Sequence, residues 1–235
     1  GYNAYSLLQT GRDEYGIPWP LSFKSFGDFK PGLYFYFVMP FVATLGLNEW
    51  AVRIPSALFG IGTVILVYFL AKEIFKEKKI ALLSSTLLAI SPWHIHFSRG
   101  GWETNAATFF ISLGVVLLIK GLKNKWLLFW SMVSFLASMY TYQSPRLVVP
   151  IFLIFLLILY TEEFNSMIRI IRTKVGGISL MILIILSIPL LLQFTSGGGS
   201  SRFQGLSFLS DSGPASRVNE LRGEHDALDN IYSKF

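Results

Sequence analysis

The stretch Ile54–Ala71, which reads IPSALFGIGTVILVYFLA, carries no charged residue and is long enough to cross the hydrocarbon core of a bilayer as one helix. Such a crossing takes roughly 17–25 predominantly apolar residues. Three further uncharged runs meet the same criterion, and two slightly shorter runs end at a Lys or Arg that can reach the interface by snorkelling. The pattern therefore predicts six transmembrane helices. The other five runs, in chain order, are Ile80–Ser98, Thr104–Ile119, Trp126–Pro145, Leu147–Thr161 and Val175–Ser201.

The composition indicates the same class of protein. Of the 235 residues, 52% are hydrophobic and only 14% are charged, whereas a soluble domain carries about 25% charged residues. We therefore expect an all-α integral membrane protein, a polytopic helical bundle. The chain contains no cysteine, which excludes disulfides, Cys-zinc sites and thiol catalysis.

Three loops between the predicted spans are basic. Ten Lys and Arg residues stand there against four acids, and this excess equals the net charge of +6 of the whole chain. The positive-inside rule therefore assigns these loops to the cytoplasm and places the segments 1–53 and 202–235 outside. The ten basic residues are Lys72, Lys76, Lys78, Lys79, Lys120, Lys123, Lys125, Arg169, Arg172 and Lys174.

The first outer segment contains one more apolar run, Leu33–Leu47, which is too short to cross a bilayer. We expect it to form an interfacial helix on the outer leaflet. The predicted organisation is an extracytoplasmic first loop with this helix (1–53), a transmembrane bundle (54–201) and an extracytoplasmic loop that leads toward further spans (202–235). An outer N-terminal stretch of this length also makes us expect an earlier span upstream.

The run Phe26–Pro31, FGDFKP, opens the interfacial segment, and Pro31 suits the first turn of a helix. A helix N-terminus offers free N–H groups and a partial positive charge, to which Lys30 adds a full charge. These residues predict a phosphate-binding site at headgroup depth that includes Asp28 and Lys30. Alternatively, Lys30 snorkels to lipid phosphates and pairs with Asp28. The acidic pair Asp13–Glu14, earlier in the same loop, is expected to be solvated.

A second cluster, HIHFSRGGWETN at His94–Asn105, joins two predicted spans on the same side of the membrane as Lys30. Arg99 and Glu103 are its candidate ligand contacts, because ionisable groups at a membrane surface beside a Gly-Gly turn are suited to that role. Glu103 is a candidate base, a candidate metal ligand, or an acid favoured at a helix N-terminus. His94 and His96 point to different helix faces, so we do not expect them to share a metal.

A third outer turn, YTYQSPR at Tyr140–Arg146, ends in a cation. Arg146 either binds a second anion or anchors its helix at the interface. All of the candidate residues thus fall on one membrane face, which suits a substrate that is an anionic lipid carrying a transferable group. The candidates are Asp28, Lys30, Arg99, Glu103 and Arg146.

Three segments carry a resemblance to a known family: FGDFKPGL at Phe26–Leu33, NEWAVRIPS at Asn48–Ser56 and SRGGWE at Ser98–Glu103. They resemble the GT-C membrane glycosyltransferases of the protein O-mannosyltransferase and lipid A aminoarabinose transferase superfamily, similar to glycosyltransferase family 39. The resemblance covers residues 1–146. It implies inverting transfer of a sugar from a polyprenyl-phosphate donor to a glycan, lipid or protein acceptor at the outer face of a prokaryotic cytoplasmic membrane. No nucleic-acid partner is expected.

The resemblance also implies roles for individual residues. Lys30 falls on the lysine of the family's Lys-Pro element, which is associated with the lipid phosphate. Glu103 falls where many members have an Asp, so this chain departs from the pattern by one methylene. The family's main catalytic Asp belongs to an Asp-Glu pair that precedes a segment like Tyr2–Leu8, and we expect it upstream of Gly1. The pair Asp13–Glu14 follows that segment and is not its counterpart.

Two other function classes remain open at this point. A transporter or flippase of lipid-linked saccharides would need ionisable residues near the middle of its spans. A non-catalytic membrane assembly subunit would not depend on Lys30 or Glu103. The span centres here carry no charge, which favours the glycosyltransferase. The sequence assigns no cofactor with certainty, and a divalent metal remains a candidate.

Overall fold

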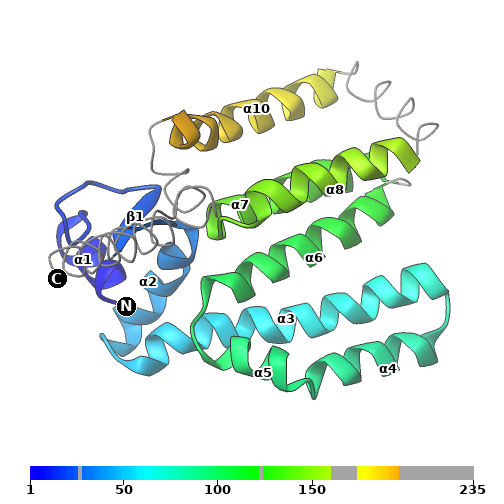
Figure 1. Ribbon diagram of the computed structural model, residues 1–235, viewed down its shortest axis with the longest axis horizontal. Helices are drawn as coiled ribbons and strands as arrows, with labels where there is room; N and C mark the ends of the chain where they lie inside the picture. Colours follow the sequence, from blue (N-terminus) through cyan, green and yellow to red (C-terminus); the bar gives the residue numbers. More distant parts are fainter. Residues whose placement is uncertain (26–27, 122–123, 160–173, 196–235) are drawn as a thin grey trace, which may run out of the picture.

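The computed structural model describes residues 1–25, 28–121, 124–159 and 174–195. Most of this part is helical, and the long helices lie side by side (Figure 1). The one sheet in the described part is a hairpin of two short strands. The elements in chain order are α1 (Tyr2–Thr10), β1 (Ser22–Ser25), β2 (Asp28–Pro31), α2 (Leu33–Leu45), α3 (Glu49–Phe75), α4 (Lys78–Ala89), α5 (Pro92–Arg99), α6 (Glu103–Gly121), α7 (Lys125–Thr141), α8 (Pro145–Leu159) and α10 (Lys174–Thr195).

Within the described residues, each predicted span overlaps a helix or a pair of helices. In the described part, α3 and α6 are each long and apolar enough to cross a membrane, and α4 with α5 pass the same test as a pair bent by 58°. The described apolar stretches of α7, α8 and α10 are shorter. The chain is therefore a helical, multi-pass membrane protein with two candidate spans, or three counting the bent pair, among the described residues. The count of six stays a prediction.

Small residues allow the long helices to approach closely. A Cβ at Gly62 of α3 would lie 2.6 Å from the ring of Phe109 on α6. A Cβ at Gly114 of α6 would lie 2.7 Å from the ring of Phe135 on α7. Beside that contact, the buried Ser131 hydroxyl of α7 donates a hydrogen bond to the Gly114 carbonyl at 2.7 Å. Glycine contacts and interhelical hydrogen bonds of this kind are typical of packing in lipid.

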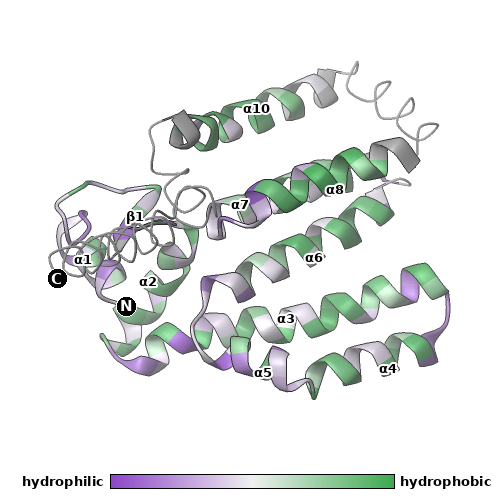
Figure 2. Cartoon of the chain, viewed as in Figure 1, coloured by the Kyte–Doolittle hydropathy of each residue, from purple (hydrophilic) through white to green (hydrophobic). Residues whose placement is uncertain are grey.

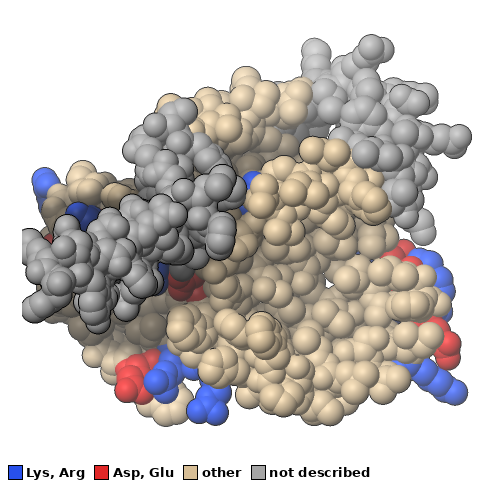
Figure 3. Space-filling model, viewed as in Figure 1, with Lys and Arg blue, Asp and Glu red and all other residues tan. Residues whose placement is uncertain are grey.

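Charged side chains lie at the two ends of the bundle. Figure 2 shows apolar residues along the long helices, and Figure 3 shows an uncharged belt between the charged ends on the face in view. The basic turns α3–α4 and α6–α7 share one end (Figure 1), where Lys120 Nζ lies 4.9 Å from the ring centroid of Phe69. The predicted topology requires these two basic turns to lie at the same end of the bundle. The third basic loop, at 160–173, and the outer segment 202–235 lie outside the described residues.

Helix α2 runs across the ends of the long helices instead of alongside them (Figure 1). Its 13 residues give a length of about 20 Å at 1.5 Å per residue, against a hydrocarbon core of about 30 Å. This agrees with a short helix that does not span, and its place on the outer leaflet stays a prediction. A buried cluster fixes α2 to α1, α3 and α6: Ala4, Tyr34, Val38, Val42, Ala51 and Ala106.

The hairpin corrects one expectation, a helical Pro31, and adds two short strands to a fold that is otherwise helical, as expected. Pro31 ends β2 opposite Ser22, and α2 begins at Leu33 after the N-cap Gly32. A strand end tolerates the missing N–H of proline as well as a first helical turn does. Gly32 is required for this tight entry into α2, because a Cβ there would lie 2.8 Å from the buried ring of Phe23.

Candidate functional site

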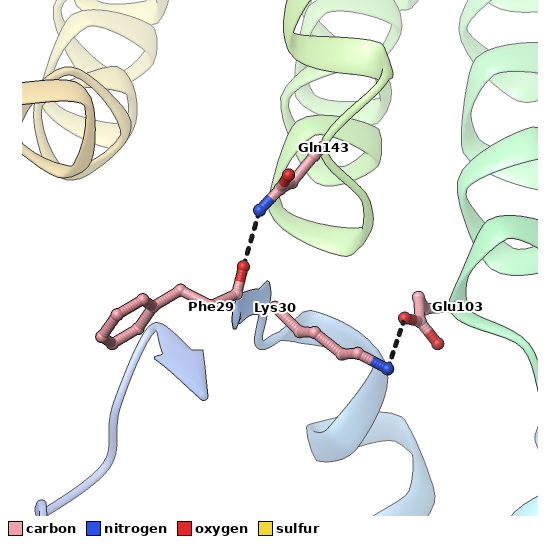
Figure 4. Close-up of polar contacts among 4 residues, drawn as sticks. All are labelled: Phe29, Lys30, Glu103 and Gln143. Carbon is pink, nitrogen blue, oxygen red and sulfur yellow. Dashed lines mark hydrogen bonds and ion pairs between the residues drawn. The ribbon is translucent and has the colours of Figure 1, made fainter. Parts of the chain in front are cut away.

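The candidate site centres on an ion pair between the β1–β2 hairpin and the start of α6. Lys30 Nζ of β2 lies 3.6 Å from Glu103 Oε1, at the first residue of α6. Figure 4 shows the lysine side chain extended toward the carboxylate. The exposed fraction is 34% for the Lys30 side chain and 17% for that of Glu103. The structure thus brings together two of the residues that the sequence singled out.

The hairpin register directs Lys30 toward the rest of the protein. Lys30 is paired with Phe23, and directly opposed residues of an antiparallel pair project from the same face. Phe23 is completely buried, so its face of the hairpin is the inner one. A second contact holds β2 in place: Gln143 Nε2, in the turn between α7 and α8, donates a hydrogen bond to the Phe29 carbonyl at 2.6 Å (Figure 4).

A buried polar network fixes the start of α6, where Glu103 lies. The Asn105 side chain, only 3% exposed, donates to the Ser56 carbonyl at 2.6 Å and to its hydroxyl at 3.2 Å. The Ser56 hydroxyl in turn donates to the Phe97 carbonyl of α5 at 3.1 Å. Three helices meet at this point. Because the network satisfies buried polar groups on all three, it holds Glu103 at a defined position.

Tyr34 of α2 completes the surroundings of Glu103. Its hydroxyl donates to the Val52 carbonyl at 3.0 Å. Burial raises the pKa of the Tyr34 hydroxyl, and the negative charge of Glu103 raises it further. The phenol is therefore a neutral hydrogen-bond donor over the whole physiological pH range. The positive charge beside the Glu103 carboxylate comes from Lys30.

The other predicted site residues have different surroundings. Arg146, the second residue of α8, is partly buried, and its Nε donates to the Met139 carbonyl at 3.1 Å. Arg99 is exposed and lines a separate hollow between α3 and α5. Asp28 is paired with Ser25 in the hairpin, and its side chain lies outside what the structure describes. Lys30 and Glu103 are therefore in direct contact, and the Gln143 contact ties the turn before Arg146 to the same hairpin.

The acidic pair of the first loop differs from its prediction. Asp13 is only 4% exposed, and its Oδ1 accepts hydrogen bonds from the N–H groups of Tyr15 at 2.9 Å and Ile17 at 2.8 Å. The expectation that Asp13 is solvated is wrong, because its carboxylate organises a tight turn, as Asp commonly does. Glu14 is exposed, as expected.

Sequence reasoning did not single out Gln143, Ser56 or Asn105. All three have a small polar or amide side chain near the end of an apolar run. If such a side chain is buried there, it needs a hydrogen-bond partner, and this requirement is the signal that could have found them. For a metal, the described ranges contain no cluster of three or more His, Cys, Asp or Glu side chains.

Comparison with known proteins gives a family. Residues 30–191 match the family described as dolichyl-phosphate-mannose-protein mannosyltransferase. No solved structure gives a significant match. Relatives include two proteins of Bacillus subtilis (strain 168). "Putative mannosyltransferase YkcB" is 28% identical over 152 residues, which are 63% of this chain and 20% of the relative. "Putative mannosyltransferase YycA" is 27% identical over 179 residues, which are 74% of this chain and 25% of the relative.

A third relative, an uncharacterized protein of Aquifex aeolicus (strain VF5), is 34% identical over 102 residues, which are 43% of this chain and 20% of the relative. The chain thus spans about a fifth to a quarter of the length of these relatives. The family match covers more than half of the chain and includes both Lys30 and Glu103. This chain therefore belongs to the dolichyl-phosphate-mannose-protein mannosyltransferase family of GT-C membrane glycosyltransferases.

Proposed function

We propose that this chain forms the donor-binding part of an inverting membrane glycosyltransferase. The enzyme moves a sugar from a polyprenyl-phosphate donor to a glycan, lipid or protein acceptor. The reaction takes place at the extracytoplasmic face of a prokaryotic cytoplasmic membrane. The observation that carries this proposal is the ion pair between Lys30 and Glu103, held where three outer segments meet.

Lys30 is suited to bind the phosphate of the donor. Its ammonium is only partly exposed, and we assign the end of the bundle that carries the hairpin and α2 (Figure 1) to the depth of lipid headgroups. Charge-assisted hydrogen bonds from such a group to phosphate are shorter and stronger than neutral ones. As the sugar leaves, negative charge grows on the phosphate, and a fixed cation stabilises that charge in the transition state.

Glu103 acts on the acceptor side of the reaction. In the structure its carboxylate is the counterion of Lys30. A donor phosphate competes for the same ammonium, and its arrival releases the carboxylate to accept the proton of the acceptor hydroxyl. The hydroxyl oxygen then bonds to the anomeric carbon while the bond from that carbon to the phosphate oxygen breaks. Polyprenyl phosphate leaves with the electron pair.

Arg146 and Asp28 complete the proposed donor site. The contact between Gln143 and the Phe29 carbonyl links the α7–α8 turn to the hairpin, and Arg146 follows that turn directly. We assign Arg146 as the second cation for the donor phosphate. We assign Asp28, two residues before Lys30 in β2, to the sugar.

The charge distribution supports the orientation. The two described basic turns share the end of the bundle opposite to α2 and the hairpin (Figure 1), and basic loops favour the cytoplasm. The Lys30–Glu103 pair then faces the outside. Uncharged span centres favour a fixed site at one face over a transport path through the membrane.

The test reconstitutes the complete protein in vesicles with a polyprenyl-phosphate sugar in the outer leaflet. The expected result is sugar bound to an acceptor with inverted anomeric configuration, together with free polyprenyl phosphate. Movement of the intact lipid-linked sugar between leaflets, without transfer, would instead identify a flippase. Retained configuration would exclude the single-displacement mechanism.

A further inference from the structure

A hollow of about 370 Å³ lies between α3, the end of α4 and α5, on the outside of the bundle. Its walls are mainly apolar, with Ile61 and Ile65 from α3 and Ala89 and Ile95 from the bent pair. Its wall also carries Arg99, the last residue of α5, and His94 of the same helix. Neither Lys30 nor Glu103 lines it, so the hollow is distinct from the proposed donor site.

The bend between α4 and α5 creates this hollow. The two helices meet at 58°, and Pro92 at the start of α5 disfavours a continuous helix through the break. The bend directs α5 against α3, where His94 Nε2 donates to the Gly60 carbonyl at 3.1 Å. A Cβ at Gly60 would lie 2.7 Å from the Cβ of Ser98. This close packing fixes the far wall, so the hollow is already formed.

The hollow joins an apolar surface to a cation at headgroup depth. Ile61, Ile65 and Ile95 are 60%, 51% and 45% exposed, on spans whose exposed faces meet hydrocarbon. The Arg99 side chain is exposed, and none of the ion pairs found among the described residues includes it. The short turn from α5 to α6 places Arg99 on the same membrane side as Glu103.

We propose that this hollow binds a membrane phospholipid with an anionic headgroup. One acyl chain lies along the isoleucines, and the headgroup phosphate pairs with Arg99. The volume falls within the roughly 300–1,000 Å³ of small-molecule pockets. A soluble anion would leave the apolar wall unused, and a neutral lipid would leave Arg99 without a charged partner. The proposal needs only insertion in a membrane, so it stands or falls separately from the proposed transfer reaction.

The experiment measures lipid binding to the complete protein, purified and stripped of lipid in detergent, by native mass spectrometry. Phosphatidylglycerol is compared with phosphatidylcholine of the same chain length. Arg99→Ala should weaken phosphatidylglycerol binding about fivefold, the contribution of one cation to an anionic headgroup, while Arg99→Lys should retain most of it. Ala89→Phe, which fills the hollow, should weaken the binding of both lipids. The matched control is Arg53→Ala, which removes an exposed arginine of the same bundle end that is paired with Glu49.

If Arg99→Ala and Arg53→Ala lose phosphatidylglycerol affinity equally, the loss reflects general surface charge, and the proposed site is wrong. Unchanged lipid binding in Ala89→Phe would show that no chain enters the hollow. If polyprenyl phosphate displaces phosphatidylglycerol one for one, the hollow belongs to the donor and the phospholipid assignment is wrong. Should Ala89→Phe fail to insert, the comparison between the two arginine variants still decides.

Discussion

Lys30 of the β1–β2 hairpin and Glu103 at the start of α6 share one ion pair, 3.6 Å from Nζ to Oε1. The pair connects a loop segment at the end of the bundle to the first turn of a membrane-spanning helix. A phosphate that binds the Lys30 ammonium must displace the Glu103 carboxylate or share the ammonium with it. The function proposed above therefore couples donor binding and release of the carboxylate through one side chain, and substitution of either partner should separate the two effects.

Lys30→Ala should lower transfer efficiency, kcat/KM for the donor, about ten- to a hundredfold, since a hydrogen bond to a charged group contributes about 1.5–3 kcal/mol. Lys30→Arg should retain part of the activity, because it keeps the charge but changes its geometry. The measurement is sugar transfer by the complete protein from a labelled polyprenyl-phosphate donor.

The control for that substitution is Lys24→Ala in the same hairpin. Lys24 is exposed and lies over the ring of Tyr15, 5.5 Å from its centroid, so it should have little effect on transfer. Wild-type kcat/KM in a correctly inserted Lys30→Ala protein would mean that Lys30 only anchors the hairpin to lipid.

Glu103→Gln should separate donor binding from turnover. The amide keeps the shape of the side chain and its hydrogen bonds but removes the charge that competes for Lys30. Donor affinity should stay equal or increase, whereas turnover should fall about a hundredfold, the lower end for loss of a general base. Equilibrium binding of the donor and single-turnover transfer measure the two quantities. A parallel loss of both would indicate that Glu103 only supports the structure around it.

The spans were the most predictable part of the fold, because hydrocarbon requires long uncharged helices. Ile54–Ala71 lies within α3, and Thr104–Ile119 lies within α6. The run Ile80–Ser98 gave no sign of a bend in its hydropathy. Its bend follows from Pro92, which restricts the residue before it and starts a new helix.

The contact inside the site was less predictable than its membrane side. Counting spans places Lys30 and Glu103 on one face, but their distance depends on the register of the hairpin. The prediction of a helical Pro31 is wrong because a first helical turn and a strand end accept its missing N–H equally well. The deciding feature is Phe23: its burial opposite Lys30 requires the strand pairing, and no local pattern reveals that burial.

Asn105→Ala should destabilise the protein by about 1–3 kcal/mol, the typical cost of leaving a buried polar partner unsatisfied. The substitution removes both hydrogen bonds to Ser56 and loosens the start of α6. Denaturant or thermal unfolding in detergent measures the change. Thr108→Ala is the matched control, because Thr108 is exposed on the same helix and its hydroxyl bonds only within that helix. Equal stability of the two variants would contradict the proposed network.

The orientation of the bundle can be tested independently of any activity. Lys76 lies in the basic turn between α3 and α4, where it pairs with Glu73 at 2.8 Å, and Lys24 lies at the opposite end in β1. Because basic turns favour the cytoplasm, a cysteine in place of Lys24 should react with a membrane-impermeant thiol reagent in intact cells. A cysteine in place of Lys76 should react only after permeabilisation. The 235 residues contain no native cysteine, so within this part of the protein each signal comes from the introduced position alone. Labelling of the Lys76 position in intact cells would reverse the orientation and place the Lys30–Glu103 pair in the cytoplasm, where it would meet a donor in the inner leaflet.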